Sequence, residues 1–204
     1  MKFAYFNPTV MAIADVPADV FTQLQEIVEQ AHSHREHNDA GNSAISVRGG
    51  QQIQLVPNKF GLDTSVLKYY VESQVQGYID TIMRQSGRTD LDPCEPVLIS
   101  AWTIKQTSGD YQALHTHEAH VSGNIYIDVP ELDDAASSDA NIEFRLPVIR
   151  NPANFIFVDQ WRFNPQVMKM IIFPSHIPHT VYPWKGQGHR TILAWDAKLV
   201  LKKG

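Results

Sequence analysis

Apolar residues recur at steps of three and four positions in two stretches of the first half of the chain, which predicts two amphipathic helices. The first stretch runs from Asp15 to His37, and its apolar face consists of Val20, Phe21, Leu24, Ile27, Val28 and Ala31. The second runs from Thr64 to Gln85, with an apolar face formed by Val66, Leu67, Tyr70, Val71, Val75, Tyr78, Ile79 and Ile82. Because amphipathic helices bury one face, we expect both to pack against another layer of the fold.

From Pro93 onward the pattern changes to short strands separated by Gly, Pro, Asp and Ser. Five segments are rich in β-branched and aromatic residues: "PVLISAWTIKQ", "SGNIYIDV", "NIEFRL", "MKMIIFP" and "RTILAWDAKLVL". Two packed sheets, as in a sandwich or jelly roll, are the usual way to bury so many short strands. We therefore predict a mainly β fold with N-terminal helices, in which residues 1–204 form a single domain. Residues 1–92 are its helical part, which packs on a sheet formed by residues 93–204.

Composition narrows the class of protein. The 204 residues carry a formal net charge of −5 and are 43% hydrophobic, which is typical of a globular protein with a buried core. The negative charge, without a basic patch interleaved with aromatic residues, argues against nucleic acid as a partner. The single cysteine excludes an internal disulfide, and we find neither a secretory signal nor an apolar run of about 20 residues, so we expect a cytoplasmic protein without a membrane partner. The sequence leaves a homodimer open.

Three of the nine histidines lie within the six residues of "HTHEAH", from His115 to His120. If this segment is extended, side chains alternate between faces, so His115 and His117 point the same way. Their Cα atoms are then about 6.5–7 Å apart, and the two imidazoles can converge on one ion. A His-x-His pair is a weak signal by itself, and two solvated or core-edge histidines are the alternative.

A third histidine, His179, follows the Pro-bounded segment "FPSHIP", and Arg190 comes 11 residues later at the head of the apolar strand "TILAW". This order of a His-x-His pair, intervening hairpins, a third His and a basic residue resembles that of the iron(II), 2-oxoglutarate-dependent oxygenases. It resembles in particular the members found in marine bacteria and their phages, which carry "HxH…SGxxY" and "FPS…HxVxP…R" segments. The matching residues, between about 97 and 197, are Trp102, His115, His117, Ser122, Gly123, Tyr126, Phe173, Pro174, Ser175, His179, Val181, Pro183 and Arg190.

The resemblance implies a double-stranded β-helix, a cupin-like jelly roll, over residues 93–204. It also implies that His115, His117 and His179 bind Fe(II), which uses 2-oxoglutarate and O2 as co-substrates, with no further catalytic residue beyond these ligands. The expected reaction hydroxylates a C–H bond of a second, unidentified substrate and releases succinate and CO2. A protein side chain or a small metabolite is the expected substrate.

The chain departs from the usual family pattern at two positions. Most members have Asp or Glu where this chain has His117, so three neutral imidazoles leave the ion with its full double charge and raise its chance of exchange for Zn, Ni or Cu. Arg190 is the expected partner of the distal carboxylate of 2-oxoglutarate, because a planar guanidinium suits a carboxylate. The Ser or Thr that commonly assists it is Ile192 here, and Tyr126 or Asn124 is expected to substitute. Lys105 is the next candidate for the cation.

Three further residues are candidates for the substrate pocket: His120, His176 and Trp102. A rival hypothesis uses the same fold without 2-oxoglutarate chemistry, because "GDYQALHTH" fits the Gly-x5-His-x-His start of a cupin isomerase or binding module. The Glu that cupins place a few residues after the pair is absent, since Val121 and Ser122 occupy that region. Arg190 also belongs to the oxygenase pattern rather than the cupin one.

Overall fold

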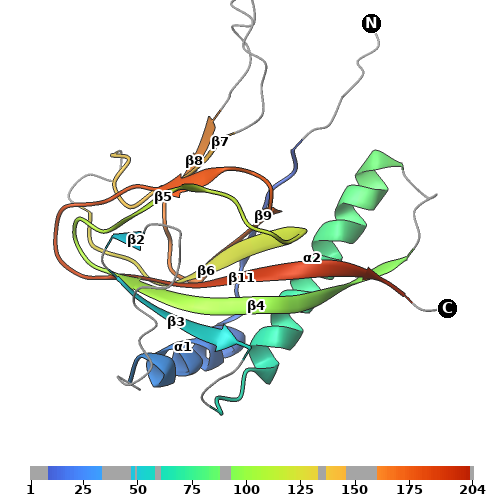
Figure 1. Cartoon of the computed structure of the whole chain (residues 1–204), viewed down its shortest axis with the longest axis horizontal. Helices are drawn as coiled ribbons and strands as arrows, with labels where there is room; N and C mark the ends of the chain where they lie inside the picture. The colour runs from blue at the N-terminus through green and yellow to red at the C-terminus, as the bar shows by residue number, and fades with distance from the viewer. Residues whose placement is uncertain are drawn as a thin grey trace, which may run out of the picture.

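Two antiparallel sheets face each other, and two helices cover the outer face of the larger sheet (Figure 1). The computed structural model describes residues 9–33, 47–48, 50–57, 61–87, 93–132, 137–145 and 160–202. The larger sheet has the strand order β1-β9-β6-β11-β4-β3, and the smaller has the order β2-β5-β10-β7-β8. The elements are β1 (Ala12–Asp15), α1 (Ala18–Ser33), β2 (Val47–Arg48), β3 (Gln51–Val56), α2 (Ser65–Ser86), β4 (Cys94–Gln106), β5 (Tyr111–His115), β6 (Val121–Asp128), β7 (Ile142–Arg145), β8 (Gln160–Phe163), β9 (Lys169–Pro174), β10 (His179–Val181) and β11 (Arg190–Leu201).

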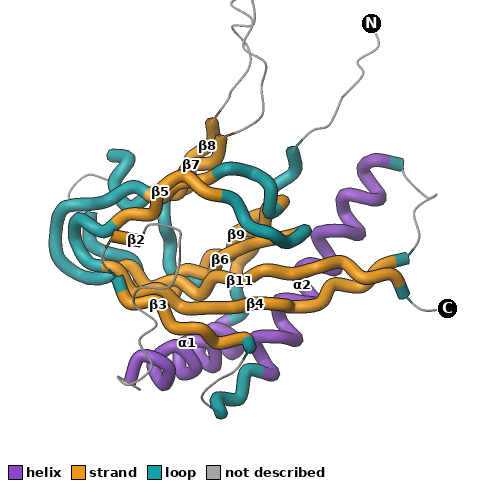
Figure 2. Tube along the Cα trace, viewed as in Figure 1, coloured by secondary structure: helices purple, strands orange, loops and turns teal. Residues whose placement is uncertain are grey.

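Alternation along the strands of the larger sheet builds two separate cores. On β11, Leu193 and Trp195 join the core beneath the two helices, whereas Ile192 and Ala194 join the core between the sheets. The helix-side core also contains the apolar faces of α1 and α2, among them Phe21, Leu24, Leu67 and Val75. Both helices therefore pack against the back of one sheet, as the sequence predicts, and the opposite face of that sheet looks into the space between the sheets (Figure 2).

The helix bounds differ from the prediction at one end. The first helix begins at Ala18 rather than Asp15, because residues 12–15 pair with β9 as an edge strand. Its last described residue is Ser33, and residues 34–37 of the prediction lie outside the described part of the chain. The second helix spans Ser65–Ser86, within one residue of the prediction, and Gly87 ends it in the left-handed conformation that glycine adopts readily.

The predicted strands after Pro93 are confirmed, and residues 1–92, expected to be the helical part, contain three short strands besides the two helices. That segment contributes β1 and β3 to the larger sheet and β2 to the smaller one. In β3, "QQIQLV", Ile53 and Leu55 are buried between polar neighbours, which is the alternation of a half-buried strand. The two helices thus interrupt a strand-forming segment instead of preceding it. Within the described residues, no helix is both long and apolar enough to cross a membrane.

Gly123 of β6 lies directly under Trp195 of β11, its partner in the strand register. A Cβ atom at this position would lie against the indole of Trp195 and the carbonyl oxygen of Ile171, closer than van der Waals contact allows. We expect Gly123→Ala to lower the free energy of unfolding by about 1–3 kcal/mol, the usual cost of overpacking a core. Urea unfolding measures this change.

Gly77→Ala is the matched control, because Gly77 is inside α2 and a Cβ there meets nothing within 4 Å. Alanine in place of a helical glycine is expected to stabilise by up to about 1 kcal/mol. Equal effects of the two substitutions would contradict the packing described for Gly123.

Candidate metal centre

The strand register of the smaller sheet places two of the predicted histidines side by side. His179 opens β10 and pairs with His115, the last residue of β5. Directly opposed residues of antiparallel strands share a face, and the centroids of these two rings are 4.2 Å apart. His179 is almost fully buried, and His115 is partly buried.

The third histidine reaches the same place from beyond the end of β5. His117 follows the strand, and its backbone N–H donates to the carbonyl oxygen of Ser175 at 3.0 Å. Its ring lies parallel to that of His179, with an interplanar angle of 3° and centroids 5.2 Å apart. One ligand atom from each of His115, His117 and His179 lies within 4.8 Å of the other two, so the predicted convergence of the three side chains is confirmed.

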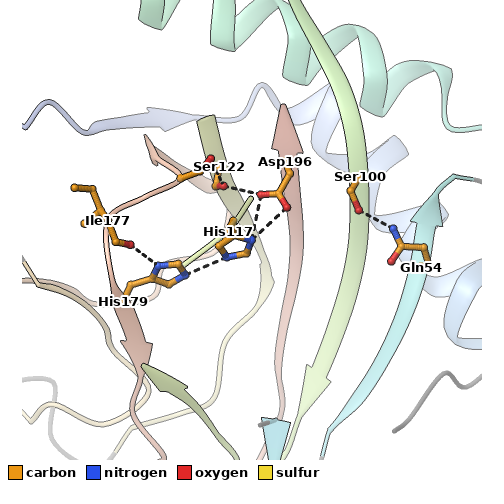
Figure 3. A network of polar contacts seen from close by, with 8 residues as sticks. Gln54, Ser100, His117, Ser122, Ile177, His179 and Asp196 are labelled. Carbon is orange, nitrogen blue, oxygen red and sulfur yellow. Dashed lines mark hydrogen bonds and ion pairs between the residues drawn. The ribbon is translucent and has the colours of Figure 1, made fainter. Parts of the chain in front are cut away.

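Each imidazole is oriented by an acceptor at its Nδ1 atom. The carbonyl oxygen of Ala113 lies 2.6 Å from Nδ1 of His115, and that of Ile177 lies 3.0 Å from Nδ1 of His179. Nδ1 of His117 is 3.2 Å from both carboxylate oxygens of Asp196 (Figure 3). A ring that donates through Nδ1 keeps the Nε2 lone pair for another partner, so the hydrogen bonds select the tautomer needed for metal binding through Nε2.

The distance between Nε2 of His117 and Nε2 of His179 is 3.3 Å. With both Nδ1 atoms donating, the two Nε2 atoms of neutral rings are both acceptors, and two acceptors do not bond to each other. A separation of 3.3 Å suits two nitrogens that each lie about 2.1 Å from one shared ion. The donor set therefore fits a divalent transition metal.

Burial keeps the rings of His115 and His179 in their neutral form. Desolvation, aided by the neighbouring His115 ring, lowers the pKa of His179 to about 3. Desolvation also lowers the pKa of His115, although its bond to Ala113 opposes the shift. Neutral imidazole is the form that binds a metal, so the site is ready for an ion at neutral pH.

The metal-free protein is expected to lose stability as the pH falls from about 6.5 toward about 3. In that window His179 of the unfolded chain binds a proton, because its pKa has the ordinary value. In the folded protein the pKa of His179 is lowered, and the ring stays neutral. Protons therefore favour the unfolded state, and stability rises again toward neutral pH. Urea unfolding at about pH 7 and about pH 5 should show a smaller loss for His179→Gln than for the wild type. An equal loss in both would contradict this assignment.

Arg190 is enclosed on the same side of β11 as Ile192 and Ala194, and only 1% of its surface is exposed. Its guanidinium donates to the carbonyl oxygen of Ala140 at 3.2 Å and to Oε1 of Gln106, its partner in the register. Its Nε has no hydrogen-bond partner among the described residues. Burial lowers the pKa of Arg190 to about 10, and the charges of Tyr126 and Asp110 act against that shift.

Tyr126 and Asn124 project from β6 into the same space between the sheets. The sequence predicts that one of them assists Arg190. Both are buried, and burial raises the pKa of Tyr126 to about 12, while the charge of Arg190 and a hydrogen bond with Asn124 act against the rise. The carbonyl oxygen of the Asn124 side chain has no partner among the described residues. A cavity of about 30 Å³ is lined by the three histidines together with Asn124, Ile192 and Ala194, and others.

The remaining predicted residues lie in different places. Trp102 of β4 stacks on His117, with ring centroids 5.7 Å apart. His120 is not part of this cavity, because it lines a larger one against α2, and its Nδ1 accepts from the backbone of Leu199. His176 is exposed in the turn before β10. Lys105 faces the helices, beside His32, because its neighbours Ile104 and Gln106 take the side of Arg190.

Two residues of the site, Asp196 and Gln106, were missed by the sequence analysis. Both lie on strands that were predicted correctly, and simple alternation gives their direction. Asp196 is six residues after Arg190 on β11, and Gln106 is four residues after Trp102 on β4, so these two side chains face the space between the sheets.

Residues 100–196 match the family described as "Putative 2OG-Fe(II) oxygenase". The structure is similar to a Pseudomonas putida prolyl-4-hydroxylase, with a TM-score of 0.60 at 16% identity over 93% of this chain and 94% of that one. It is similar to the viral collagen prolyl hydroxylase of Paramecium Bursaria Chlorella virus-1 in complex with 2OG, with a TM-score of 0.52 at 12% identity over 92% and 96% of the two chains.

A third similar structure is HygX from Streptomyces hygroscopicus with nickel, 2-oxoglutarate and hygromycin B bound. Its TM-score is 0.53 at 10% identity, over 93% of this chain and 83% of that one. At identities this low, structural similarity shows the fold alone. That fold is the predicted double-stranded β-helix. No curated protein sequence matches the chain significantly.

Proposed function

We propose that the chain is a 2OG-Fe(II) oxygenase, the family that residues 100–196 match, and that it hydroxylates a C–H bond of a protein side chain or a small metabolite. In this reaction 2-oxoglutarate is converted to succinate and CO2. The family match also weighs against the rival cupin function, which lacks 2-oxoglutarate chemistry.

The observation that carries the proposal is a buried guanidinium on the face of β11 that, through Ile192 and Ala194, also lines the cavity of the three histidines. The structure gives Arg190 no ion pair with a carboxylate among the described residues, although it is 1% exposed. A buried charge is costly unless it is paired, so a buried guanidinium that is held only by uncharged acceptors is suited to an anionic ligand. The five donors of a guanidinium suit the distal carboxylate of 2-oxoglutarate.

Each residue of the site then has a distinct part in binding. His115, His117 and His179 would hold Fe(II), and Arg190 would bind the distal carboxylate with help from the Tyr126 hydroxyl. When bound, Fe(II) supplies the oxidising chemistry of the family, using O2 and 2-oxoglutarate. In the structure the Arg190 guanidinium donates a hydrogen bond to Oε1 of Gln106. The cavity of about 30 Å³ beside the histidines is smaller than 2-oxoglutarate. Binding of 2-oxoglutarate therefore requires the Arg190–Gln106 contact to rearrange.

The second substrate is proposed to approach from the side of Trp102, which covers one face of His117. Next to Trp102 along the larger sheet, Gln54 of β3 donates to Oγ of Ser100 at 2.8 Å, so uncharged polar groups border this approach (Figure 3). Two of the similar structures are prolyl hydroxylases and one binds hygromycin B. Both a peptide and a small polar molecule are therefore candidate classes for the second substrate.

A turnover screen tests this function. The protein is incubated with Fe(II), 2-oxoglutarate and air, together with either a proline-containing peptide library or a metabolite library, and products are read by mass spectrometry. We expect one class to gain the mass of one oxygen atom in step with succinate. If neither library is oxidised but succinate is still formed, the hydroxylation of these two substrate classes is wrong while the co-substrate chemistry stands.

A further inference from the structure

We propose that Asp196 is a positioning residue for the metal. Its carboxylate bonds to the ring of His117 and so supplies, behind that ligand, the negative charge that the three neutral imidazoles lack. This inference rests on the proposed function, because it concerns the same three-histidine site. The usual non-haem iron site has two histidines and one carboxylate, and the carboxylate position here is occupied by His117. The carboxylate of Asp196 stands directly behind that residue, 3.2 Å from its Nδ1.

A chain of hydroxyl groups fixes the Asp196 carboxylate in place. Oγ of Ser122 donates to Oδ1 of Asp196 at 2.6 Å, and the hydroxyls of Ser122 and Ser175 are 2.8 Å apart. Because the proton of Ser122 goes to Asp196, Ser175 is the donor in the second bond. Both serines are buried, so the carboxylate is held by groups that do not exchange readily with solvent.

The fold brings these groups together through the strand register. Asp196 pairs with Ser122 across β11 and β6, and Ser175 follows the end of β9, the next strand of the same sheet. The backbone carbonyl of Ser175 also accepts from the N–H of His117. One segment therefore fixes both the main chain of the ligand and the carboxylate behind its ring.

The consequence for the metal is electrostatic as well as geometric. A carboxylate that accepts from Nδ1–H makes Nε2 a stronger donor and holds the ring in its metal-binding orientation. His115 and His179 donate to backbone carbonyl groups instead, which are uncharged. Among the three ligands, His117 alone has a carboxylate partner in the described structure, so it is the ligand with the most anionic character.

The test compares Asp196→Asn and Asp196→Ala with the wild-type protein. Asparagine keeps the shape, and its oxygen can accept from Nδ1–H of His117 while its amide donates to Ser122, which can reverse its hydroxyl; only the charge is lost. Alanine removes both charge and contact. We measure the dissociation constant for Fe(II) anaerobically, by competition with a chelator, and the midpoint potential of the bound Fe(III)/Fe(II) couple.

We expect Asp196→Ala to weaken Fe(II) binding by about 10- to 100-fold, the usual effect of removing such a partner. Asp196→Asn should weaken binding less but raise the potential, because Fe(III) loses a nearby negative charge; a purely structural role would not move the potential. The control is Asp128→Asn, the same change at an exposed position of β6, which should alter neither quantity.

If Asp196→Asn has the affinity and the potential of the wild type, the proposal is overturned, even if Asp196→Ala does not fold. A wild-type protein that binds no Fe(II) would refute the proposed function, and this inference with it. Failure of this inference alone is recognised by normal Fe(II) binding in the wild type and an unchanged Asp196→Asn variant.

Discussion

His179→Ala is expected to lower the affinity for Fe(II) by about 100-fold or more and to abolish succinate formation. Loss of a group that only orients a ligand costs up to about 100-fold in metal affinity, so loss of a ligand costs at least as much. His179 is the most buried of the three histidines. Anaerobic Fe(II) titration measures the affinity.

His32→Ala is the matched control for this experiment. His32 is on α1, on the opposite face of the larger sheet, where its ring bonds to the Thr103 hydroxyl at 3.2 Å. Its removal should leave the Fe(II) affinity unchanged. Similar losses in the two variants would mean that the titration reports general instability and not a ligand.

Arg190→Met is expected to weaken binding of 2-oxoglutarate by about 2–5 kcal/mol, which is roughly 30-fold to several thousand-fold in Kd. The reason is that, in the proposed complex, the distal carboxylate of 2-oxoglutarate would lose the guanidinium that pairs with it. Fe(II) affinity should stay near the wild-type value, because Arg190 is not a metal ligand. Arg190→Lys should recover part of the affinity, since a point charge replaces a planar fork.

The same variant separates co-substrate binding from folding. Arg190→Met removes the donor of the buried Gln106 and Ala140 oxygens, so we expect the Tm of the ligand-free protein to fall, by an amount that corresponds to about 1–3 kcal/mol. The rise in Tm that 2-oxoglutarate causes in the Fe(II)-loaded wild type should disappear. Arg84→Met, at the exposed end of α2, should keep that rise. A normal rise in Arg190→Met would contradict the role assigned to this residue.

The sequence predicts the fold well where the periodicity is long and regular. Both helices and the strands after Pro93 are strongly patterned, whereas β1 has four residues and β2 has two, too few for a period to be recognised. The strand β3 has a clear alternation and was missed because it lies between two helices. Tertiary pairing with β4, rather than its own propensity, decides that segment.

The candidate site is predictable in its ligands but not in the groups that orient them. His115, His117, His179 and Arg190 stand in a recognisable order along the chain. Asp196 is 79 residues from His117, and their contact brings a strand of the larger sheet against the segment that follows β5, which composition and spacing do not specify. His120 was expected in the substrate pocket because it is close in sequence to His115 and His117. It lines a different cavity instead, so closeness in sequence was a poor guide to its position.

Formation of succinate is the most direct test of the central claim, that three histidines and Arg190 form a working Fe(II) and 2-oxoglutarate site. The wild-type protein is incubated with Fe(II) and 2-oxoglutarate, with and without O2, and succinate is quantified without any second substrate. We predict slow succinate formation that requires both Fe(II) and O2 and is lost in His179→Ala. Wild-type protein that binds Fe(II) but neither binds 2-oxoglutarate nor forms succinate would contradict the account.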